Sequence, residues 1–122
     1  MESPAHIDRN THPITVSLDC NAIVDWESFH KEFARVFGFP DFYGNNMNAW
    51  IDCLTSLDAP EDGMTKIHCE PGAVVSLQLE NVKDFERRCP DQYKALIECS
   101  AFVNWRRLEL GEPSVLALSF WH

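Results

Sequence analysis

Three short segments with strand periodicity, separated by longer helical patterns, constrain the fold of this chain more than any other feature. Ile14, Val16 and Leu18 alternate with polar residues, which indicates a half-buried strand. Residues 73–80 (AVVSLQLE) and 114–121 (SVLALSFW) have the composition of two further, more buried strands. Strands joined by helices of this length need right-handed crossovers, so the sequence predicts an α/β fold with a small three-stranded parallel sheet covered by helices.

The first two helical segments carry start and stop signals. Asp25 is predicted as the N-cap of a helix over residues 26–37, which ends at Gly38. A turn follows in which Gly44 is free to take a positive φ, and Asn45 or Asn46 caps the next helix. The apolar residues of that second helix recur at i, i+3, i+4 and i+7, a stripe that faces the core: Met47, Trp50, Ile51 and Leu54.

The second half of the chain contains two more helical segments. Residues 82–89 (VKDFERRC) are a short helix candidate, and Pro90 interrupts the pattern after them. Asp91 is expected to cap a long helix that Gly111 ends. The length of 122 residues is that of one domain. We therefore expect a loose lead-in over residues 1–13 and one folded domain over residues 14–122.

The charge of the chain excludes one class of partner. Its 19 acidic and 10 basic residues give a formal net charge of -9. Such a field repels nucleic acid and anionic membrane surfaces, and it attracts basic proteins. We therefore expect no direct contact with nucleic acid and no membrane partner.

The five cysteines are an odd number without a CxxC pair, which is typical of reduced, cytoplasmic proteins. No apolar run approaches the roughly 18 residues of a membrane span. The five histidines are scattered and form no metal-binding motif, and no phosphate-binding glycine motif is present, so the sequence predicts no metal and no cofactor. A cysteine enzyme using Cys53 with His30 or His68 as base stays open as an alternative, beside the simpler interpretation of Cys53 as a buried, inert thiol.

The acidic residues are unevenly distributed. No basic residue occurs between Arg35 and Lys66, and the sequence alone offers no partner for the five acids of that window: Asp41, Asp52, Asp58, Glu61 and Asp62. Aromatic and amide side chains accompany them, namely Phe42, Tyr43, Asn45, Asn46 and Asn48. This mixture is typical of protein interfaces, although a solvated turn would have a similar composition.

Residues 37–57, FGFPDFYGNNMNAWIDCLTSL, are similar to the signature segment of the barstar family, the small intracellular inhibitors of ribonucleases. The shared residues are Pro40, Phe42, Tyr43, Gly44, Asn46, Ala49, Asp52, Cys53 and Leu54. The resemblance covers most of residues 14–121, and the family's three-stranded parallel sheet agrees with the element order derived above.

This resemblance implies that the second helix and the loop before it plug the active site of a ribonuclease, where a carboxylate replaces a substrate phosphate. Asp52 matches the family's central carboxylate, and neighbouring contact positions match Phe42, Asn46, Thr55 and Ser56. Two positions depart from the pattern of the best-known member: Asn48 stands where it has a second aspartate, and Ile51 where it has a contacting tryptophan. A further contacting glutamate of the family's late helix has no counterpart in this chain, where Arg106 lies nearest to that position. We expect that Glu61 or Asp62 supplies the missing acid, or that the target differs.

The sequence therefore predicts a noncatalytic, cytoplasmic inhibitor of a basic ribonuclease or nuclease toxin, an immunity protein of the toxin-antitoxin type. It is expected to be a monomer when free and to form a 1:1 complex with its target. The expected contact residues are Phe42, Tyr43, Asn46, Asn48, Asp52, Thr55, Ser56, Glu61 and Asp62. Besides the cysteine enzyme, a regulatory adaptor for a basic protein that is not a nuclease stays open.

Overall fold

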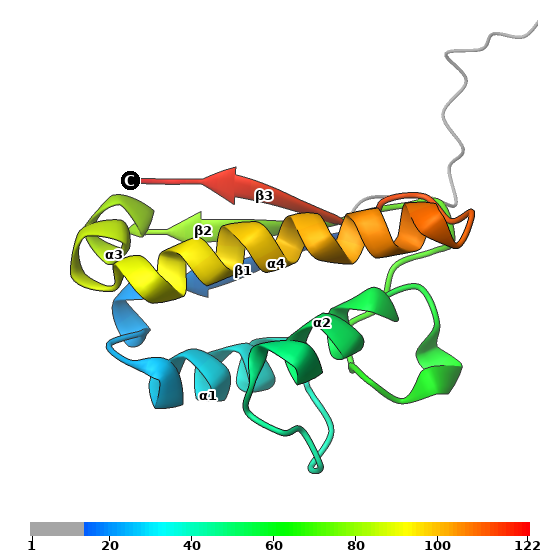
Figure 1. The fold of residues 1–122 in the computed structure, drawn as a ribbon, viewed down its shortest axis with the longest axis horizontal. Helices are drawn as coiled ribbons and strands as arrows, with labels where there is room; N and C mark the ends of the chain where they lie inside the picture. Colours follow the sequence, from blue (N-terminus) through cyan, green and yellow to red (C-terminus); the bar gives the residue numbers. More distant parts are fainter. Residues whose placement is uncertain (1–13) are drawn as a thin grey trace, which may run out of the picture.

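The computed structural model describes residues 14–122, and the expected lead-in of residues 1–13 lies outside the described residues. The elements follow the predicted order (Figure 1). They are β1 (Ile14–Asp19), the 3-10 turn η1 (Cys20–Ala22), α1 (Trp26–Phe37), α2 (Met47–Thr55), the 3-10 turn η2 (Pro60–Asp62), β2 (Val75–Glu80), α3 (Val82–Arg88), α4 (Pro90–Glu109) and β3 (Leu116–Phe120).

The strands form one parallel sheet in the order β1-β2-β3, which confirms the predicted fold class. In the register, Ile14 lies opposite Val75 and Val75 opposite Leu116. The face that carries Val16 and Leu77 is buried, whereas the opposite face is more open: Thr15 and Ser17 are exposed, and Ser76 and Gln78 are half-buried. The helices lie on the buried side, with α4 across the sheet and α1 and α2 below α4 (Figure 1).

Local sequence signals determine where α1 begins and ends. Asp25 accepts from the backbone N–H of Ser28 at 2.8 Å, and the Ser28 hydroxyl accepts from the N–H of Asp25 at 3.0 Å, which is a capping box. Gly38 ends the helix with a φ of 71°. A Cβ there would lie 2.6 Å from the Cβ of Lys66, so only glycine fits.

The core joins α1 and α2 to the sheet. Phe29, Phe33 and Phe37 line the inner face of α1 and are fully buried. Trp50 of α2 is also fully buried, and its ring meets that of Phe33 edge to face with the centroids 5.5 Å apart. The apolar stripe predicted for the second helix is confirmed, with only Met47 at its start partly exposed.

Two predicted details are wrong. Gly44 does not take a positive φ, since the left-handed residue of that turn is Asn45, with a φ of 54°. Asparagine tolerates this conformation, and it leaves Asn46 extended as the cap. Asp91 does not cap α4: Pro90 is the first residue of that helix, and Cys89 precedes it without a capping side-chain bond. Proline in the first turn removes an N–H that would otherwise need a partner, so α4 begins without an Asp cap.

Among the helices of residues 14–122, none combines the length and the apolar character that crossing a bilayer requires.

Candidate protein-interaction site

The start of α2 is fixed by Asn46, one of the predicted contact residues. Its Oδ1 accepts from the backbone N–H of Ala49 at 2.8 Å, and its Nδ2 donates to the carbonyl of Gly44 at 3.2 Å. Both ends of the side-chain amide are therefore engaged in shaping the turn. Asn46 is exposed, but its first role is to hold the loop of residues 39–46 against the helix that follows.

The outward face of α2 is polar and accessible. Asn48 and Asp52 are exposed and lie one turn apart, while the apolar stripe of the same helix is buried. Phe42, on the turn before the helix, is 75% exposed, so it does not plug the helix junction. An amide, a carboxylate and an aromatic ring therefore lie on or next to one short helix whose opposite face is anchored in the core.

Tyr43, which the sequence predicts as a contact residue, is not part of this exposed surface in the free chain. Its side chain is buried, and its hydroxyl lies 2.6 Å from Nδ1 of His30 on α1. Its ring packs against Phe39 with the centroids 4.6 Å apart. Burial raises the pKa of Tyr43 and lowers the pKa of His30, so both groups are held neutral. Tyr43 thus anchors the turn that presents Phe42.

Thr55 and Ser56 close α2 and are half-buried. The Thr55 hydroxyl donates to the carbonyl of Ile51 at 2.6 Å, and the backbone N–H of Ser56 reaches the carbonyl of Cys53 at 3.3 Å. Their side chains lie at the edge of the exposed face, where a partner would reach them only in part. Glu61 and Asp62 follow on η2 and are exposed, ahead of the turn at Gly63.

Two of the acids between Arg35 and Lys66 form ion pairs, although the sequence alone offers no partner for any of the five. Asp52 accepts from Nη1 of Arg106 on α4 at 2.8 Å, and about half of each side chain remains exposed. Asp58 forms a bidentate pair with Arg107, at 2.6 Å and 3.0 Å. Both arginines lie about fifty positions further along the chain, so no local pattern reveals these pairs.

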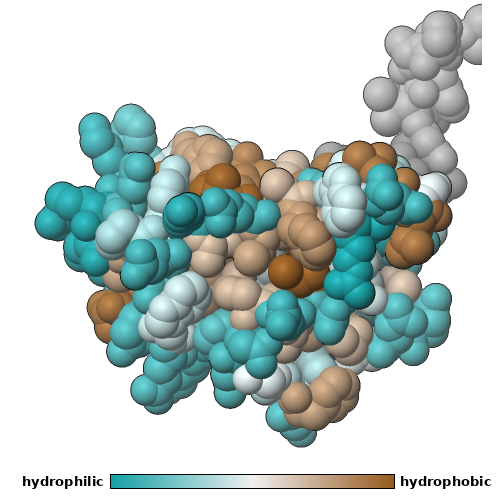
Figure 2. Space-filling model, in the orientation of Figure 1, coloured by the Kyte–Doolittle hydropathy of each residue, from teal (hydrophilic) through white to brown (hydrophobic). Residues whose placement is uncertain are grey.

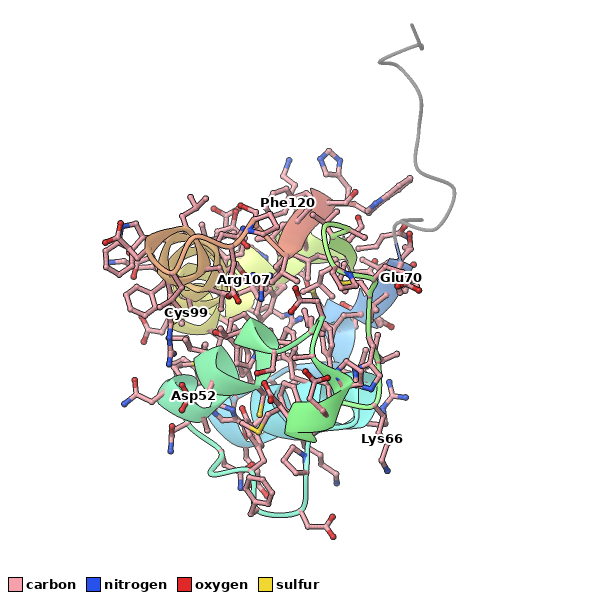
Figure 3. All side chains as sticks on the ribbon, turned by 90° about the vertical axis from the view of Figure 1, so that its right-hand side faces the viewer. Asp52, Lys66, Glu70, Cys99, Arg107 and Phe120 are labelled. Carbon is pink, nitrogen blue, oxygen red and sulfur yellow. The ribbon has the colours of Figure 1, made fainter. Side chains whose placement is uncertain are left out.

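Arg107 is the main residue that sequence reasoning missed. Its side chain is 3% exposed and, besides Asp58, donates to the carbonyls of Thr55 at 2.9 Å and Pro113 at 2.8 Å. It therefore joins the end of α2, the loop before η2 and the connection from α4 to β3. Figure 3 shows Arg107 inside the fold, while Asp52 lies at its edge.

The structure gives no support to cysteine chemistry. Cys53 is buried, and burial together with the neighbouring Asp52 carboxylate raises the pKa of its thiol to about 11. Within residues 14–122, no hydrogen bond joins a cysteine to a histidine, and His30 is occupied by Tyr43. Nor does this part of the chain contain a group of three or more His, Cys, Asp or Glu side chains placed to hold a metal ion.

Comparison with known proteins agrees with the fold. Residues 14–116 match the model of the family described as Barstar (barnase inhibitor). The chain is also 27% identical over 88 residues to a protein of Bacillus subtilis (strain 168) named "Putative ribonuclease inhibitor YrdF". That match covers 68% of this chain and 97% of the Bacillus protein. Because the family model spans nearly all of the described residues, the chain belongs to the Barstar family.

Proposed function

We propose that this chain is a noncatalytic inhibitor of a basic ribonuclease or nuclease toxin of the barnase type, and that α2 with its flanking loops occludes the active site of that enzyme. Membership of a family described as barnase inhibitors and the name of the Bacillus relative support the inhibitory role. The observation that carries the mechanism is the exposed carboxylate of Asp52 on a helix whose other face is locked into the core.

The chemistry follows from what a ribonuclease active site binds. Such a site presents Arg, Lys and His side chains to phosphate groups, and a carboxylate accepts charge-assisted hydrogen bonds from the same donors. The backbone that presents Asp52 is already ordered before binding, because the inner face of α2 is buried in the core and Tyr43 anchors the turn that carries Phe42. Steric exclusion of RNA then completes the inhibition without any bond being broken.

The positions at which this chain differs from the family pattern indicate which kind of enzyme it binds. Asn48 is exposed but neutral, Ile51 is buried, and Arg106 pairs with Asp52. The outward face of α2 therefore carries a single acid, and the further acids available at the same end of the helix are Glu61 and Asp62. We infer that the target presents its basic groups to Asp52 and to the η2 loop rather than along the whole of α2.

The remaining expectations belong to the same proposal. The net charge of -9 favours a basic enzyme over nucleic acid as the direct partner. An inhibitor that inserts one helix into one active site forms a 1:1 complex, and a role in protecting the producing cell places it in the cytoplasm.

Truncation of Asp52 tests the mechanism, with barnase as the enzyme. Asp52→Ala should weaken binding by about 2–5 kcal/mol, mostly through faster dissociation, a range that measured charge pairs, those of the barnase–barstar complex among them, already define. Asn48→Ala, one turn away, should cost only about 0.5–1.5 kcal/mol, because a neutral amide exchanges ordinary hydrogen bonds. Calorimetric dissociation constants and inhibition of RNA cleavage are the measurements.

Asp91→Ala is the matched control, since it removes the same charge from an exposed site in the first turn of α4. It should leave binding nearly unchanged. The mechanism is contradicted if folded Asp52→Ala inhibits as well as the unmodified chain. The function itself is contradicted if the unmodified chain neither binds barnase nor slows its cleavage of RNA.

A further inference from the structure

The outer side of β3 lacks the features that usually keep other strands away from the edge of a sheet. Within residues 14–122, β3 pairs with β2 and has no strand on its other side, which we call the β3 edge. Edge strands commonly carry a lysine, a proline or a bulge that discourages further pairing. Residues 114–121 (SVLALSFW) contain no charged residue and no proline, and the register with β2 runs without a break. A further strand can therefore pair with the β3 edge.

The backbone groups at this edge can be identified from the opposite side of the strand. The N–H of Trp121 donates to the carbonyl of Leu79 at 2.9 Å, so the backbone of Trp121 faces β2. Successive residues of a strand face opposite sides, so the N–H and C=O groups of Leu118 and Phe120 point away from β2. No backbone or side-chain group of the described part of the chain bonds to them there. The β3 edge thus offers two donors and two acceptors.

A second copy of the same edge, running antiparallel, matches these groups. When Leu118 of one copy lies opposite Phe120 of the other, the two residues exchange both of their N–H···O bonds. The same holds for Phe120 of the first copy and Leu118 of the second, with a two-fold axis through Ser119. The β3 edge is therefore self-complementary in its hydrogen bonding.

The side chains of the β3 edge fit the same register. Phe120, which is 50% exposed, comes to lie beside half-buried Leu118 of the other copy. On the open face of the sheet, Trp121, which is 54% exposed, stands opposite Ala117, a small and exposed residue. The indole of Trp121 is already oriented, because its Nε1 donates to the hydroxyl of Ser119 at 2.9 Å. Cross-strand pairs that join an aromatic and an aliphatic side chain stabilise antiparallel ladders.

The side of α4 next to this edge carries no charge either. Asn104 marks that side, since its Nδ2 donates to the carbonyl of Leu116 at 2.8 Å and its Oδ1 accepts from the N–H of Leu116 at 3.2 Å. Ala101 and Leu108 lie one turn on either side of Asn104 and are exposed, and half-buried Ile97 lies one turn before Ala101. In Figure 2, apolar atoms gather along the middle of the upper side, where Figure 1 shows β3 beside α4.

The charges that flank the β3 edge permit a second copy. The hollow at the end of β3 is lined by His122 and by two basic and two acidic side chains: Lys83, Arg87, Asp84 and Glu86. The exposed charges of α4 and of the connection to β3 include Lys94, Glu98, Glu109 and Glu112. Antiparallel pairing brings Glu112, before the start of one β3, towards the end of the other copy that carries Lys83 and Arg87.

The net charge of -9 opposes association of two copies, but it acts from outside the paired edge. No charged side chain lies on residues 114–121. At physiological ionic strength, salt screens charges that are more than about 8 Å apart. The repulsion should therefore weaken the dimer at low salt without preventing it.

We propose that two copies of this chain associate through antiparallel pairing of their β3 edges, which joins the two three-stranded sheets into one. The dimer takes the place of the free monomer that the sequence predicts, and it does not rest on the proposed function. The exposed face of α2 stays open, since Phe120 and Asp52 lie well apart in Figure 3. Each copy can then still bind one enzyme.

Sedimentation velocity from about 10 µM to about 1 mM tests the pairing. A monomer–dimer equilibrium is expected, and added salt should shift it towards the dimer because it screens the repulsion. Ala117→Lys should raise the dimer dissociation constant about tenfold or more, because the new side chain takes the place of Trp121 of the other copy. This loss is opposite to what a smaller negative net charge alone would cause.

Thr15→Lys is the matched control. Thr15, Ser76 and Ala117 form one row across the sheet, so the same charge is added to the same face at the edge formed by β1. This variant should leave the dimer dissociation constant unchanged within the error. Phe120→Lys is a second test of the β3 edge and should also dissociate the dimer. Circular dichroism and thermal unfolding verify that each variant is folded.

Three results would overturn the proposal. One is a chain that stays monomeric up to about 1 mM at physiological salt. Another is a dimer that Thr15→Lys dissociates as strongly as Ala117→Lys does, since the pairing would then not be specific to β3. The third is a folded Ala117→Lys variant that still dimerises but binds barnase more weakly, which would assign the β3 edge to the enzyme. Unchanged binding of barnase by Ala117→Lys is expected.

Discussion

Asp52 does not stand alone on α2, because Arg106 holds one of its carboxylate oxygens. Both side chains are about half exposed, and exposed pairs of this kind contribute about 0–1 kcal/mol to folding. Towards a basic enzyme, however, Arg106 is a like charge beside the main acid. Its pairing with Asp52 must be exchanged for pairing with the partner when the complex forms.

Arg106→Gln should therefore tighten binding to barnase, chiefly through faster association, while the free energy of unfolding changes by less than about 1 kcal/mol. Stopped-flow association rates and urea unfolding measure the two effects. Lys94→Gln removes the same charge from an exposed position near the start of α4 and should have the smaller effect on the rate. Weaker binding of Arg106→Gln would mean that Arg106 itself contacts the enzyme.

His30 links pH to stability through the turn that presents Phe42. Burial lowers the pKa of His30 below that of a free histidine, so the unfolded chain binds this proton more readily than the folded one. The stabilising effect of neutral His30 is complete above a pH of about 6.5 and declines as the pH falls towards the folded-state pKa. The unfolding free energy of the unmodified chain should be lower at pH 5.5 than at pH 7.5. In His30→Gln this difference should be smaller, because the titrating group is absent. His122→Gln, at an exposed position, should keep the full difference.

At the scale of elements, Arg107 fastens the end of α2 to α4 and to the connection before β3. Asp58→Ala leaves this buried guanidinium without its bidentate partner, with Glu112 3.7 Å away as the remaining carboxylate. The expected loss of unfolding free energy is about 3 kcal/mol. Asp62→Ala, an exposed acid of the neighbouring turn, should change it by less than about 0.5 kcal/mol. Denaturant titrations compare the two variants. Equal unfolding free energies would contradict the role of the Asp58–Arg107 pair in joining α2 to α4.

The elements themselves could be predicted from the sequence because each has a local cause. The alternation at Ile14, Val16 and Leu18 and the caps at Asp25 and Asn46 act within a few residues of where they are read. Arg106 and Arg107 could not be placed in this way, since their partners are set by how α4 packs on α2. The burial of Tyr43 has the same explanation, because it depends on His30 of α1.

At the scale of the whole molecule, the net charge of -9 should guide the approach of a basic enzyme from a distance. Salt screens such attraction within about 10 Å at 0.1 M, so raising the ionic strength should slow association with barnase far more than it speeds dissociation. The double variant Glu61→Gln and Asp62→Asn, which leaves the Asp58–Arg107 pair intact, should reproduce part of this effect on association. Association rates that stay constant across a tenfold range of salt would remove the electrostatic argument.

Within residues 14–122, helices cover one face of the sheet, whereas most parallel sheets are covered by helices on both faces. Thr15 and Ser17 on the other face are exposed, so a change there alters neither the packing of the core nor the exposed face of α2. Mutational tolerance should therefore alternate along β1, where buried Val16 and Leu18 are constrained and exposed Thr15 and Ser17 accept substitution. A fluorophore or a surface tether attached at Ser17 would leave the helical side of the molecule open to its partner.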